Sequence, residues 1–110
     1  MARQHAYASL RAVLHALRDR LDVEVAAHLS AQLPMLVRGI FYEGWDPTRV
    51  PVRMTVDEFL DRVEAEAHLK GRSEAENAAR TVTTALWSEL TPGMVEHVMK
   101  LLPEEYGEIF

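Results

Sequence analysis

The chain contains no cysteine, so it offers neither a disulfide framework nor thiolate chemistry. No apolar run approaches the roughly 20 residues that a membrane-spanning helix needs. The first residues, Met1–His5, lack the layout of a signal peptide, in which a charged segment is followed by an apolar one. We therefore expect a cytoplasmic protein with no membrane partner.

The sequence also lacks the motifs on which common enzyme sites are built. It has no glycine-rich phosphate loop, no nucleophile elbow and no Ser-His-Asp arrangement. Acidic pairs such as Asp57 and Asp61 fall on polar helix faces, where solvation explains them. We expect a protein that is not an enzyme and has no catalytic residue, no metal site and no cofactor.

Positive charge is scarce in the second half of the chain. The net charge is -5, with +2 in residues 1–54 and -7 in residues 55–110. An acidic chain repels phosphate backbones, which argues against nucleic-acid binding. The uneven charge would allow head-to-tail self-association, although two solvated faces with a chance bias explain it more simply.

Apolar residues recur at steps of three and four along most of the chain, the period of an amphipathic helix. This period predicts helices over about 2–20, 23–33, 34–42, 55–70, 73–90 and 91–102, and a last turn over 104–110. We expect His15 on the surface of the first helix, and Arg11, Arg18, Asp19 and Arg20 on or near its polar face. Every periodic segment has the helical period, so the fold class is all-α.

Short polar residues indicate where several helices begin. Asp22 and Thr91 are expected N-caps, because their side-chain oxygens can accept a free backbone N–H. Thr55–Glu58 and Ser73–Glu76 both have the spacing of a capping box. Gly71 is expected to end the helix before it.

The chain contains an internal repeat. Shifted by 69 residues, segment 6–41 aligns with segment 75–110 without a gap, and eleven of the 36 aligned positions are identical. The identities include a Leu-Pro break (Leu33-Pro34 and Leu102-Pro103) and an Ile-Phe ending. A connector over 42–54 and an extra helix over 55–70 separate the two copies. We predict one domain over 1–110, an orthogonal-type bundle of six to seven helices built from two pseudo-symmetric repeats.

The repeat also has a gap, because the extra helix over 55–70 precedes only the second copy. A groove on the first repeat is therefore expected to lie open where a matching helix would pack. Exposed apolar grooves are usually filled by a second chain or a partner helix, so we expect a homodimer, with or without helix exchange. The alternative is that Met1–His5 and the connector cover the gap.

Two groups of residues are candidate sites. The first group ends the first repeat and has no copy in the second: Arg38, Tyr42, Glu43, Trp45 and Asp46. Tyr, Trp and Arg are frequent anchors of interaction surfaces, although Trp45 can instead fold back as a lid on the core. The second group is His28 and His97, which occupy equivalent repeat positions. Neither has a second ligand at a recognised spacing, so structural histidines are favoured over metal ligands.

The chain resembles a known bacterial family in four places. They are 10–21, the run 27–47 that contains Gln-Leu-Pro and Tyr-Glu-Gly-Trp-Asp-Pro, the helix around 57–60 and the closing turn 102–106. Together they closely resemble the family catalogued as domain of unknown function twenty-two sixty-seven. The resemblance implies a small all-helical protein with tandem helical repeats and no established activity. It also implies an extra N-terminal helix that this chain lacks.

Our functional interpretation is a non-catalytic module for protein–protein interaction or self-association, acting as a homodimer or with a protein partner. The alternative is a regulatory protein that binds a small ligand or a metal between the repeats.

Overall fold

The computed structural model describes the backbone of residues 2–110 and the side chains of residues 6–110. These residues form α1 (Ala2–Asp19), α2 (Val23–Ser30), α3 (Met35–Tyr42), α4 (Val56–Ala67), α5 (Arg72–Glu89), α6 (Pro92–Leu101) and the 3-10 helix η1 (Glu104–Glu108), with no strand among them. The predicted all-α class and the number of helices are therefore confirmed. None of the described helices is long and apolar enough to cross a membrane.

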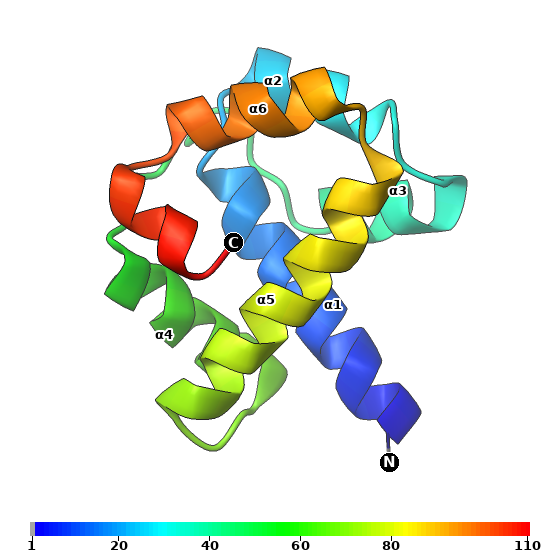
Figure 1. Cartoon of the computed structure of the whole chain (residues 1–110). Coiled ribbons are helices and arrows are strands. Elements are labelled where there is room, and N and C mark those ends of the chain that lie inside the picture. Colours follow the sequence, from blue (N-terminus) through cyan, green and yellow to red (C-terminus); the bar gives the residue numbers. More distant parts are fainter. Residues whose placement is uncertain (1) are drawn as a thin grey trace.

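The two long helices α1 and α5 cross near the middle of the molecule, and α4 packs against both of them (Figure 1). Helix α3 packs against α1. Helices α2 and α6 lie at the same end of the molecule (Figure 1). There Gln32, just after α2, accepts a hydrogen bond from the backbone N–H of Thr91 at 2.9 Å.

The helices of the two repeats occur in the same order along the chain. Shifted by 69 residues, α1, α2 and α3 begin within one residue of α5, α6 and η1. The N-caps Asp22 and Thr91 fall at equivalent positions, and each side chain accepts a hydrogen bond from the backbone N–H three residues on. The pseudo-two-fold relation between the two repeats in space stays a prediction.

The core is built mainly from the apolar stripes of α1, α4 and α5. Its largest fully buried side chains include Tyr106, Phe41, Phe59, Leu14, Leu17, Leu21, Leu29 and Leu60. Tyr106 donates its hydroxyl to the backbone oxygen of Met54 at 2.7 Å, and Arg20 lies over its ring at 5.8 Å. Burial raises the pKa of the Tyr106 phenol.

Helix α1 is buried on several sides, which corrects two of our expectations. His15 and Arg18 were expected on its polar surface, but only 8% and 4% of their surface is exposed. Residues 12–18 are buried without interruption, because α3, α4 and α5 all pack against this helix. A central helix has no wide solvent face, so polar residues on it must find partners inside the protein.

The boundary between α4 and α5 also differs from our prediction. Helix α4 ends at Ala67, with His68 in the left-handed conformation at φ +55°. Gly71, at φ +112°, does not end α4 but is the N-cap of α5. Ser73 therefore lies inside the first turn of α5, and the predicted capping box at Ser73–Glu76 was wrong.

The capping box of α4, in contrast, is formed by both of its hydrogen bonds. Glu58 N–H donates to Thr55 Oγ1 at 3.1 Å, and Thr55 N–H donates to Glu58 Oε1 at 2.8 Å. We expect Thr55→Ala to lower the free energy of unfolding by about 1 kcal/mol, because it leaves a helix N–H unpaired. Ser73→Ala is the matched control and should change it by less than about 0.5 kcal/mol. Urea unfolding followed by circular dichroism measures both, and equal losses would contradict the assigned caps.

Candidate interaction sites

The five residues that we predicted as an interaction surface lie near the end of α3 and make many contacts within the chain. Arg38 Nε donates to the backbone oxygen of Ser30 at 3.0 Å, and its Nη2 donates to that of Leu33 at 3.1 Å. The Tyr42 hydroxyl lies 2.6 Å from Ser30 Oγ. Arg38 and Tyr42 thus hold α3 against the end of α2.

Glu43 joins the end of α3 to α1. Arg11 Nε donates to Glu43 Oε1 at 2.6 Å, and Arg18 Nη1 donates to the Glu43 backbone oxygen at the same distance. The hydrogen bond from Arg11 lowers the pKa of the Glu43 carboxyl. Glu43 therefore forms a structural contact, although its carboxylate stays exposed.

Trp45 and Asp46 begin the connector. Trp45 is half-buried, packs against the core and lies 5.0 Å from the Tyr42 ring, centroid to centroid. Asp46 accepts hydrogen bonds from the hydroxyl and the backbone N–H of Thr48, which lower the pKa of its carboxyl. The packing of Trp45 favours the alternative in which it covers the core. The use of the five residues as an interaction surface stays a prediction.

His15 belongs to a polar cluster that sequence reasoning missed. Its Nε2 donates to the backbone oxygen of Ile40 at 2.8 Å, and its Nδ1 lies 2.8 Å from Glu66 Oε2. His15 thereby connects α1 to both α3 and α4. No signal for this cluster is present in the sequence, because both partners of His15 lie far from it in the chain.

An open apolar groove lies between the first turns of α1 and helix α3. We call it the α1/α3 groove, and its lining is Ala6, Tyr7, Leu10, Leu36, Val37 and Ile40 around a space of about 250 Å³. Leu36 is 69% exposed and Tyr7 is 45% exposed. Met35, at the start of α3, is 84% exposed. The groove lies on the first repeat, where the repeat pattern predicted an open one.

The connector does not line this groove. The side chains of Met1–His5, which we named as an alternative cover, lie outside the described residues.

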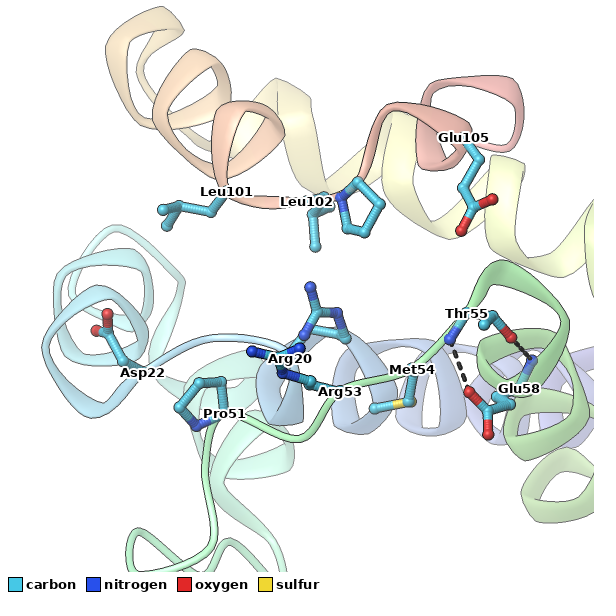
Figure 2. A pocket seen from close by; sticks show the side chains of 11 residues that line it. Arg20, Asp22, Pro51, Arg53, Met54, Thr55, Glu58, Leu101, Leu102 and Glu105 are labelled. Atoms are coloured by element: carbon cyan, nitrogen blue, oxygen red, sulfur yellow. Dashed lines mark hydrogen bonds between the residues drawn. The ribbon is translucent and has the colours of Figure 1, made fainter.

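A second hollow, the inter-repeat pocket, lies between the end of α1 and the α6–η1 segment (Figure 2). It has a volume of about 610 Å³, and its lining includes Arg20, Arg53, Met54, Leu101, Leu102 and Glu105. Arg20 Nη1 donates to the backbone oxygen of Val52 at 2.9 Å, while its buried Nε has no partner among the described residues.

The equivalent histidines His28 and His97 are both exposed. Within the part of the chain that the structure describes, no three His, Cys, Asp or Glu side chains are grouped closely enough to hold a metal ion.

The fold is that of a small all-helical protein, and an open apolar groove lies on its first repeat. The family model described as "Uncharacterized conserved protein (DUF2267)" matches residues 1–109. The chain therefore belongs to the DUF2267 family, as the sequence resemblance indicated. A search of the curated proteins gave no match.

Proposed function

We propose that the protein is a non-catalytic protein–protein interaction module that works through the α1/α3 groove. The observation that carries this proposal is the exposure of Leu36 in a groove lined by apolar residues. Contiguous exposed apolar surface is costly in water and is found most often at interaction sites. The exposed Met35 extends the same surface, and flexible methionine suits a binding face that must adapt to its partner.

The partner is a second copy of the chain or another protein, and the setting we propose is the bacterial cytoplasm. The proposal includes neither an enzymatic reaction nor nucleic-acid binding. Arg38, Tyr42 and Glu43 contribute by holding α3 in place, so that Leu36 and Val37 face the groove.

Light scattering on the purified protein tests self-association through this surface. Where the partner is a second copy, we expect the apparent mass to rise from the monomer value of 12.5 kDa toward twice that value as concentration approaches about 1 mM. Leu36→Glu should keep the protein monomeric, because it places a charge on the groove. Val23→Glu is the matched control, since Val23 is also exposed but lines neither the groove nor the inter-repeat pocket. Equal association of all three proteins would contradict a role for the groove.

A second candidate function is the binding of a small ligand in the inter-repeat pocket. The buried Arg20 Nε, which has no partner within the described residues, supports it, because buried donors are normally paired. A small molecule or metal retained in a native mass spectrum of the purified protein would favour this function over the first.

A further inference from the structure

The α1/α3 groove has a counterpart in the second repeat that is already filled. Shifted by 69 residues, its six lining positions become Ala75, Glu76, Ala79, Glu105, Tyr106 and Ile109. Ala75, Ala79, Tyr106 and Ile109 are buried. In the first repeat, Ala6 is exposed and Leu10 and Val37 are only partly buried. The aligned positions of the two repeats are therefore mostly buried in the second copy and mostly open in the first.

Helix α4 forms part of the cover in the second repeat. It packs against α5, and the ring of Phe59 lies 5.6 Å from the ring of Tyr106, centroid to centroid. Phe59 also contacts Phe110, at 5.5 Å. Along α4 the buried residues are Phe59, Leu60, Val63 and Ala67, the spacing of an amphipathic helix. The second repeat thus shows what kind of element fits this site.

The residues at the edge of the α1/α3 groove also indicate that it binds an occupant. The second repeat has Glu76 and Glu105 at the two edge positions, as expected where a packed helix meets water. The first repeat has Tyr7 and Leu36 there, both exposed. Apolar side chains at both edges widen the surface that an occupant would remove from water. Burying such side chains favours a complex, because it removes apolar area from water.

We infer that the α1/α3 groove binds an amphipathic helix of another polypeptide, in the position that α4 takes on the second repeat. The size of the groove favours this occupant over a second copy of the folded protein. A stable interface uses about 20–30 residues on each side, whereas one helix in a groove needs only a few anchor side chains. The chain's own α4 cannot serve without leaving the buried site it already fills. The inference rests on the proposed function and specifies the chemistry of the partner.

Fluorescence anisotropy with two labelled peptides tests the inference. The first has the sequence of residues 54–70, which contains α4 and its capping box. The second carries Phe59→Trp, because Val37 leaves more room opposite this position than Tyr106 does. We expect at least one peptide to bind the full chain saturably below about 1 mM. Binding should weaken at least about tenfold with Leu36→Glu protein and stay unchanged with Val23→Glu protein. The control peptide, with Phe59→Glu, should not bind.

The other outcomes overturn the inference in distinguishable ways. If neither peptide binds while Leu36→Glu abolishes self-association, the groove is an interaction surface but not one for a helix, and the proposed function stands. If neither peptide binds and Leu36→Glu leaves association unchanged, both proposals fail. Equal binding to the wild-type and Leu36→Glu proteins places the peptide elsewhere and also overturns the inference.

Discussion

Arg18→Ala is expected to lower the free energy of unfolding by about 2–4 kcal/mol, because one buried and one part-buried backbone carbonyl lose their hydrogen-bond donor. The Arg18 side chain is 5% exposed, and its Nε donates to Asp19 at 2.8 Å. Its Nη1 donates to the backbone oxygens of Phe41 and Glu43, at 3.0 and 2.6 Å. These carbonyls lie at the end of α3, where helix hydrogen bonds run out. Alanine would leave two carbonyls unpaired in a region that water does not easily reach.

Arg49→Ala is the matched control for this prediction. Arg49 also pairs with an aspartate, Asp46, but its side chain is 82% exposed. Exposed pairs of this kind contribute about 0–1 kcal/mol, so the free energy of unfolding should hardly change. Guanidinium unfolding at neutral pH measures both variants. Similar stabilities for the two would mean that Arg18 does not hold the end of α3.

Phe59→Ala is expected to cost about 3–5 kcal/mol, because it opens a cavity in a fully buried site between α4, α5 and η1. Removing the ring also removes edge-on contacts with Tyr106 and Phe110. Leu36→Ala is the matched control, because Leu36 lines the open α1/α3 groove. Leu36 is 69% exposed, and the change should stay within about 0.5 kcal/mol. A loss for Leu36→Ala comparable to that for Phe59→Ala would show that the groove is closed within the chain.

Local sequence chemistry predicted the six α-helices and several of their first residues. Apolar periodicity located all six, and Asp22, Thr55 and Thr91 indicated where three of them begin. These signals depend on neighbouring residues, which the sequence shows directly. The failure at Ser73–Glu76 has a local cause, since Gly71 took the N-cap position two residues earlier.

Long-range contacts were the part that the sequence could not provide. His15 and Arg18 read as surface residues because periodicity assumes that each helix has one solvent face, and α1 does not. Their partners, such as Ile40 and Phe41, are more than twenty residues away in the chain. For the candidate sites, the repeat predicted an open groove on the first copy. The structure identified the residues that line the groove and the exposure of Leu36. It also showed that most of the aligned residues of the second repeat are buried.

The measurement that tests the helix-binding groove most directly is a map of amide chemical shifts when the peptide of residues 54–70, or its Phe59→Trp form, is added to the labelled full chain. We predict that the changes cluster at residues 6–10 and 36–40, on the two walls of the α1/α3 groove. Changes at Ala75–Ala79 and around Tyr106 instead would mean that the peptide exchanges with the chain's own α4. That result would contradict an open helix site on the first repeat.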